Sequence, residues 1–169
     1  MRVLLISMLI AMCAAIQTSV LPLFAFGGFR PDLLLLLVVA FAVQDGPEVG
    51  VRLGFVAGLT TDLLLETSSL GVASLTFALV GYAVGVSRPY LAPNSITAPL
   101  VLGLIGSTLG ALLLGGLGNV LGDGDASLSL IVTASLYVGV INTILIGFVL
   151  KLTRGLSSRF PAEGTPLSR

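Results

Sequence analysis

Charged residues are scarce in this chain, and they gather in short clusters separated by long apolar runs. Asp, Glu, Lys and Arg make up 9% of the 169 residues, whereas apolar residues make up 56%. A soluble domain has about a quarter charged residues, so this chain lacks the polar surface that a water-soluble fold needs. Most of the apolar runs are close to the length that crosses a bilayer. The pattern therefore predicts an all-α integral membrane protein.

Proline, glycine and charged residues divide the chain into six predicted membrane helices, the second of them short. We expect these helices at residues 3–21, 31–44, 48–66, 70–87, 96–117 and 127–150. The second apolar run is roughly 18 Å long at the helical rise. It either packs inside the bundle or thins the membrane locally. Residues 1–152 then form the transmembrane domain, and residues 153–169 form a flexible basic tail.

The basic residues predict the orientation of the bundle. An even number of helices puts both termini on one side of the membrane. Cytoplasmic loops carry an excess of Lys and Arg, so we expect that side to be the cytoplasm. Of the 8 basic residues, Arg30 alone then lies outside. The basic residues expected inside are Arg2, Arg52, Arg88, Lys151, Arg154, Arg159 and Arg169.

Composition argues against most catalytic and metal-binding chemistry. The chain has no histidine and a single cysteine, Cys13, so the usual soft metal ligands, an internal disulfide and His-dependent triads are missing. Zero net charge gives no support for nucleic-acid binding. Asp123 and Asp125 lie among glycines, which is typical of turns. We expect no catalytic, cofactor-binding or metal-binding residues, and an intramembrane enzyme would need Asp62 and Glu66 as an acid–base pair.

The range 48–66 carries a ridge of residues at four-residue steps. These residues are Gly50, Gly54, Gly58, Asp62 and Glu66. Glycines in such a row let a neighbouring backbone approach closely. Asp62 lies about 21 Å from the inner end of the helix, a depth at which a carboxylate faces the bundle interior. It either binds a ligand, an ion or a partner helix, or it is a buried tie to a backbone group or to a neighbour such as Gln17.

Further small residues are spaced for close packing on three other predicted helices. They serve either packing inside the chain or contact with a partner helix. Asn142, at mid-membrane depth, is expected to form hydrogen bonds between helices. The candidate small residues are Ala11, Ala15, Gly81, Gly85, Gly106 and Gly110.

The order of several short motifs resembles the MreD family. Arg30-Pro31-Asp32 precedes a run of five leucines, and Gly46-Pro47 follows, as in the second helix of that family. The stretch from Gly54 to Asp62 and the glycines of residues 80–85 continue the likeness. The resemblance covers the organisation of the whole chain, with its specific residues between Arg30 and Arg88.

The resemblance implies a non-catalytic scaffold subunit of the bacterial rod-shape, or elongation, machinery in the inner membrane. Its implied partners are the transmembrane helix of MreC, together with MreB, RodA and a class-B penicillin-binding transpeptidase, and it would support lateral peptidoglycan synthesis and cell shape. Self-association into a homo-oligomer stays open. MreD proteins are also similar in fold to the substrate-binding components of energy-coupling-factor transporters, so the alternative is a vitamin-binding component. The chain has no tryptophan and three tyrosines, few groups for lining such a pocket.

Overall fold

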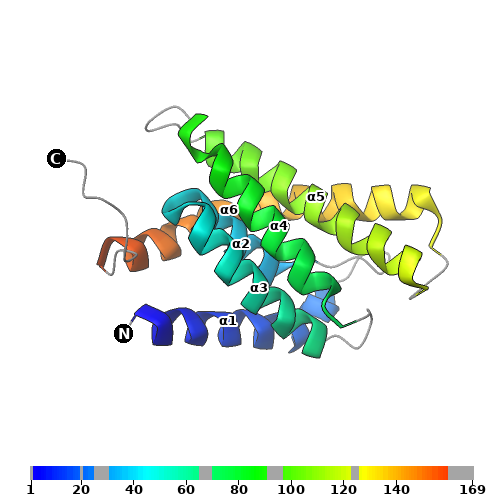
Figure 1. Cartoon of the computed structure of the whole chain (residues 1–169), viewed down its shortest axis with the longest axis horizontal. Helices are drawn as coiled ribbons and strands as arrows, with labels where there is room; N and C mark the ends of the chain where they lie inside the picture. The colour runs from blue at the N-terminus through cyan, green and yellow to red at the C-terminus, as the bar shows by residue number, and fades with distance from the viewer. Residues whose placement is uncertain are drawn as a thin grey trace.

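The described residues of the protein form a bundle of six α-helices. The computed structural model describes residues 2–19, 21–24, 31–64, 70–90, 97–122 and 126–159. Two short 3₁₀ helices accompany the α-helices, η1 (Leu21–Phe24) and η2 (Arg88–Tyr90), and the described residues contain no strand. The predicted all-α, six-helix fold is confirmed (Figure 1). The α-helices are α1 (Arg2–Ser19), α2 (Leu33–Asp45), α3 (Pro47–Leu64), α4 (Val72–Ser87), α5 (Thr97–Leu121) and α6 (Leu128–Arg159).

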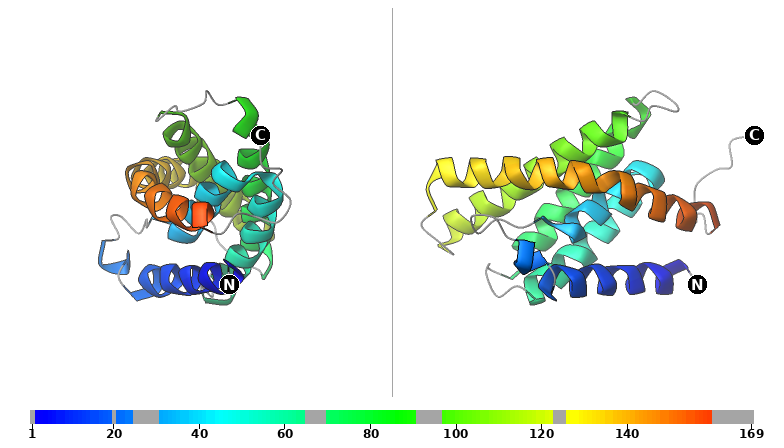
Figure 2. Two further views of the ribbon diagram at one scale, coloured as in Figure 1. Left: turned by 90° about the vertical axis from the view of Figure 1, so that its left-hand side faces the viewer. Right: turned by 180° about the vertical axis from the view of Figure 1, so that it is seen from behind.

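The short helix α2 lies at the centre of the bundle. Its 13 residues rise about 20 Å, and every residue from Leu34 to Ala42 is buried. The other five α-helices all contact it (Figure 2). A helix that is apolar all round belongs inside a protein or a membrane, and here it is inside the protein. Of the two predictions for this segment, packing inside the bundle is confirmed, and α2 itself does not face lipid.

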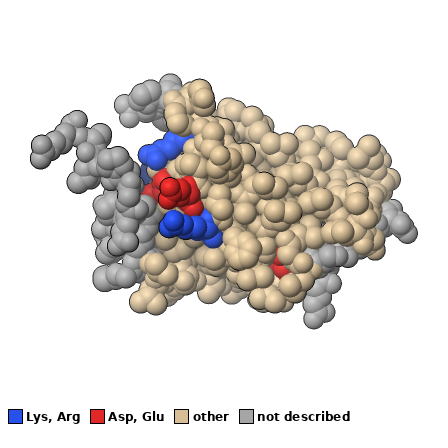
Figure 3. All heavy atoms as spheres, in the orientation of Figure 1, with Lys and Arg blue, Asp and Glu red and all other residues tan. Residues whose placement is uncertain are grey.

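Charged residues gather at one end of the bundle, which we call the charged end (Figure 3). It is formed by the end of α2, the start of α3, the end of α4 and the last turns of α6. Helix α1 begins and α6 ends on this side (Figure 1). The charged residues there are Asp45, Glu48, Arg52, Arg88, Lys151 and Arg154.

Within the described ranges, three helical segments are long and apolar enough to cross a membrane. They are Val72–Tyr90, Thr97–Leu121 and Leu128–Gly155, and the shorter apolar helices are Val3–Ser19 and Leu33–Asp45. The bundle also exposes many large apolar side chains on its outside, as expected for a protein surrounded by lipid rather than water. The expected membrane residence is confirmed.

Two helix ends differ from the expected ranges by four residues or more, and the others differ by one or two residues or not at all. Helix α5 ends at Leu121 rather than near residue 117. The next residue, Gly122, adopts a left-handed φ of 87°. Helix α6 continues to Arg159 rather than residue 150, so residues 153–159 are helical and the expectation that the flexible tail begins at 153 is wrong. Lys, Leu and Arg favour helices, and the first proline after α6 is Pro161. The expected tail from residue 160 onward, Arg30 and Glu66 lie outside the described residues.

Candidate functional site: buried helix starts and the faces of α1, α3 and α4

The glycine ridge of α3 lies directly against the backbone of α4. A Cβ atom added at Gly54 would lie 2.3 Å from the carbonyl oxygen of Phe77, and one added at Gly58 would lie 2.4 Å from that of Ala73. Gly50 meets Gly81 in the same way. Real Cβ atoms do not approach backbone atoms so closely. The two helices can therefore pack at this distance because the contact residues have no side chains.

Asp62 extends this ridge and caps the start of α4. Its side chain is 5% exposed. Oδ1 accepts a hydrogen bond from the backbone N–H of Ala73 at 3.0 Å, and Oδ2 accepts from that of Gly71 at 3.0 Å. Oδ2 also accepts from the N–H of Ser74 at 3.1 Å and from its hydroxyl at 2.8 Å. Of the two interpretations of Asp62, these hydrogen bonds agree with the second, a buried side chain tied to backbone groups.

Helix α4 depends on Asp62 because its own N-cap residue has no side chain. That residue is Gly71, which has a left-handed φ of 102° and provides no capping group. The first amides of a helix lack partners within the helix, and leaving them unsatisfied in a membrane costs free energy. A carboxylate at this position also interacts favourably with the positive end of the helix dipole. Asp62 thus performs from α3 the role that a capping residue of α4 would normally play.

Asp32 does the same for the central helix α2. It is the N-cap residue, and its Oδ1 accepts a hydrogen bond from the N–H of Leu35 at 3.0 Å. The N–H of Leu34 donates to Oε1 of Gln17 on α1 at 3.1 Å. Pro31, which precedes the cap, is buried. The described part of the Arg30-Pro31-Asp32 motif therefore starts a helix inside the bundle, and Gln17 contacts α2 rather than Asp62.

Asn142 ties the start of α2 to the α5–α6 hairpin. It is fully buried, and its Nδ2 donates to the carbonyl oxygen of Asp32 and to Oγ of Ser107, each at 3.1 Å. The expectation that Asn142 links helices is confirmed. The role of Ser107 is not predicted from the sequence, because a serine in an apolar helix commonly bonds its own backbone. Together these contacts define the capping end of the bundle, formed by Gln17, Asp32, Asp62 and Asn142.

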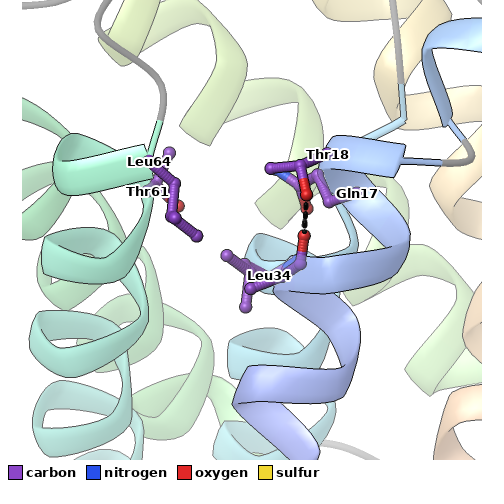
Figure 4. Close-up of a pocket in the computed structure, with 6 residues that line it drawn as sticks. Gln17, Thr18, Leu34, Thr61 and Leu64 are labelled. Atoms are coloured by element: carbon purple, nitrogen blue, oxygen red, sulfur yellow. Dashed lines mark hydrogen bonds between the residues drawn. The ribbon is translucent and has the colours of Figure 1, made fainter.

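A narrow crevice opens at the capping end between α1, α2 and α3 (Figure 4). It has no room for a water-sized molecule, whereas small-molecule sites usually have about 300–1,000 Å³. The walls are mainly side-chain carbon, and Oε1 of Gln17 is engaged by Leu34. The lining residues are Ala14, Gln17, Thr18, Leu34, Thr61 and Leu64.

The glycine rows of α4 and α5 are used inside the chain. A Cβ added at Gly85 would lie 2.4 Å from Cα of Pro47. Those added at Gly106 and Gly110 would meet side chains of α2, Val39 and Leu35. The interpretation of these rows as partner faces is therefore wrong, and the alternative of internal packing holds.

Helix α1 is different, because its small residues Ala11 and Ala15 face outward. Both are exposed, and α1 packs mainly on α2 and α3 (Figure 2). Met12 and Ile16, which directly follow these alanines, are large and exposed, and Met8 lies one turn before Met12 in the same row. The outer face of α1 thus combines a row of small residues with a row of large ones.

The described residues contain no cluster of three or more His, Cys, Asp or Glu side chains that could hold a metal ion. The two acids at the capping end, half-buried Asp32 and buried Asp62, each accept hydrogen bonds from the start of a helix. These carboxylates therefore satisfy backbone N–H donors within an apolar bundle.

Comparison with protein families gives one match that covers most of the chain. The model of the family described as "rod shape-determining protein MreD" matches residues 1–156. Comparisons with curated proteins and with solved structures returned no match. The family functions in determining the rod shape of bacterial cells and resides in the inner membrane. The chain belongs to the MreD family of rod shape-determining membrane proteins.

Proposed function

We propose that this protein is a non-catalytic scaffold of the rod-shape machinery that binds the transmembrane helix of MreC. Family membership supplies the role in cell shape. The observation that supports a scaffold is the use of the acidic groups at the capping end: Asp32 and Asp62 both cap helices. A general acid or base must be free to exchange a proton with a substrate, and these carboxylates are engaged by backbone donors.

The outer face of α1 is the proposed site for the partner helix. Helices associate in lipid through close packing of small residues. The glycine rows of α4 and α5 are occupied within the chain, whereas Ala11 and Ala15 are exposed. A single partner helix could lie along this face, with its larger side chains over the alanines and its own small residues against Met8 and Met12.

In this proposal the charged end faces the cytoplasm. Arg88, Lys151 and Arg154 are exposed there, which agrees with the excess of basic residues on the inner side of membrane proteins. Through MreC the protein would join MreB, RodA and a class-B penicillin-binding transpeptidase in supporting lateral peptidoglycan synthesis. A vitamin-binding function finds no comparable support: within the part of the chain that the structure describes, the crevice at the capping end has no room even for a water-sized molecule.

Co-purification with MreC tests the proposed α1 face. We expect a variant carrying Ala11→Leu and Ala15→Leu to fold normally and to lose most of the bound MreC. Gly147→Leu is the matched control, because Gly147 is an exposed small residue of α6 with no neighbour near its added Cβ. Full retention of MreC by the double α1 variant would exclude this face as the binding site.

A further inference from the structure

Helix α6 carries two exposed basic residues at the point where it reaches the charged end. They are Lys151 and Arg154. Thr153, which lies between them in the chain, is buried, and its Oγ1 accepts a hydrogen bond from Nε2 of Gln44 near the end of α2. From there α6 continues to Arg159 and extends past α2 (Figure 2). The two basic residues therefore lie where the helix leaves the apolar part of the bundle.

These two cations differ from the other described basic residues of the charged end, which lie beside negative groups of the chain. Arg52 forms an ion pair with Glu48 at 3.6 Å. Arg88 lies against the end of α2, and the carbonyl end of a helix favours a cation. Neither Lys151 nor Arg154 forms an ion pair with an acid that the structure describes. Helix α6 thus presents two positive charges that no described side chain balances.

An apolar surface leads along the same face of α6 into the membrane. Ile144, Gly147 and Phe148 precede Lys151 at three- or four-residue steps, so they share one face of the helix with both cations. The side chains of Ile144 and Phe148 are 75% and 74% exposed. A Cβ atom added at Gly147 would meet no other atom. This face therefore passes from large apolar side chains to two positive charges over about three turns of helix.

The order of these groups matches an anionic phospholipid that lies along α6. Helical side chains lean toward the N-terminus of their helix, which for this part of α6 is the membrane side. We therefore expect the charged groups of Lys151 and Arg154 to lie over the apolar turn that precedes them. The two residues are about 4.5 Å apart along the axis, which fits within a headgroup layer of about 5–8 Å. Basic residues at such a position attract anionic lipid.

We propose that this face of α6 binds one anionic phospholipid. Its phosphate lies at Lys151 and Arg154, and an acyl chain lies along Ile144, Gly147 and Phe148. Phosphatidylglycerol has the required net negative charge, whereas the ammonium group of phosphatidylethanolamine would meet two like charges. A free phosphate ion has no chain to cover the apolar part of this face. The inference is independent of binding to MreC, which is proposed for α1.

Native mass spectrometry of the whole protein tests this inference. The protein is released from micelles that contain phosphatidylglycerol or phosphatidylethanolamine, and the bound lipids are counted at increasing lipid concentration. One basic residue near an anionic surface contributes about fivefold to affinity. The double variant Lys151→Gln, Arg154→Gln should therefore bind phosphatidylglycerol about 25-fold more weakly. Both side chains are exposed, so we expect the variant to keep the packing of α6.

Two further variants separate this site from general attraction to positive charge. Arg52→Gln is the matched control, because it removes an exposed cation that Glu48 already balances, and it should change the affinity little. The charge-conserving pair Lys151→Arg, Arg154→Lys should bind as the wild type does. Equal weakening by Arg52→Gln and by the double glutamine variant would overturn the proposal, because affinity would then follow the net charge of the whole charged end.

The nature of the ligand is tested on the wild-type protein. We expect phosphatidylglycerol to bind at least about tenfold more tightly than phosphatidylethanolamine, and inorganic phosphate in excess to leave the bound lipid in place. Equal affinity for the two lipids would overturn the proposal, since the two cations would then not select an anionic headgroup. Displacement of the lipid by inorganic phosphate would also overturn it, because the apolar part of the face would contribute nothing.

Discussion

Helices pack in two different ways in the two halves of this bundle. Between α3 and α4, a Cβ atom added to a glycine of α3 would meet backbone atoms of α4, as at Gly54 and Gly58. On α5, a Cβ atom added to a glycine would meet the end of a side chain instead: at Gly106 it would lie 3.0 Å from Cγ2 of Val84. Backbone cannot move aside without separating two helices, whereas a side chain can change rotamer. The same residue type should therefore tolerate substitution very differently in the two regions.

The largest effect is expected at the α3–α4 contact. Gly58→Ala should lower the free energy of unfolding by about 3 kcal/mol, because the new methyl group would meet the backbone of Ala73 and Ser74 at 2.4 Å. Gly54→Ala should behave alike. Unfolding in mixed micelles measures the change, with wild-type protein as the reference. A loss below about 0.5 kcal/mol in both variants would mean that the helices separate easily and that the close contact is not essential.

The capping carboxylate should give the next largest effect. Asp62→Asn replaces one acceptor oxygen by an NH₂ group that faces backbone donors, and we expect a loss of about 2 kcal/mol. Glu48→Gln is the matched control, because Glu48 is exposed and its ion pair with Arg52 at 3.6 Å lies on the surface, where such pairs contribute about 0–1 kcal/mol. Equal stability of the two variants would contradict the capping role of Asp62.

A smaller effect is expected where the two halves are joined. Asn142→Leu removes hydrogen bonds to Asp32 and Ser107, and bonds of this kind between membrane helices contribute about 0.6 kcal/mol on average. We expect a loss of about 1 kcal/mol, measured by the same unfolding assay. Ser107→Ala should cause part of the same loss and add little in the double variant. Fully additive losses would show that Asn142 and Ser107 do not act as a pair.

The smallest effect is expected on α5. Gly106→Ala should change the free energy of unfolding by no more than about 1 kcal/mol, because the nearest atoms are the methyl groups of Val84 and Val39 at 3.0 and 3.2 Å. The free energies of unfolding of Gly106→Ala and Gly58→Ala should be measured under the same conditions. If Gly106→Ala is the more damaging change, the contrast between the two halves is wrong.

The sequence predicts much of this fold because lipid imposes simple rules. Scarce charge and apolar runs identify the helices, and the four-residue steps from Gly50 to Asp62 identify a packing ridge. Asp32 before five leucines has the pattern of a capping residue. The sequence does not show that the apolar run after Asp32 is enclosed by every other helix, because lipid and protein interior select the same residues.

The particular partners of Asp62 could not be predicted for a different reason. Its partners Gly71, Ala73 and Ser74 belong to the next helix, and only the geometry of the α3–α4 hairpin brings them together. The small-residue rows show the same limit. Gly81 and Ala11 have equivalent spacing patterns, yet Gly81 contacts α3 while Ala11 is exposed. The glycine at the start of α4 is the one signal available, since a helix that begins after Gly71 needs a cap from elsewhere.

Photo-crosslinking in living cells tests the proposed scaffold role most directly. A photoreactive amino acid is placed at Ala11 on the outer face of α1 or at Gly147 on the exposed face of α6. The account predicts a covalent adduct with MreC from position 11 and none from position 147. Adducts from position 147 with none from position 11 would contradict the assignment of α1 as the helix that receives the partner.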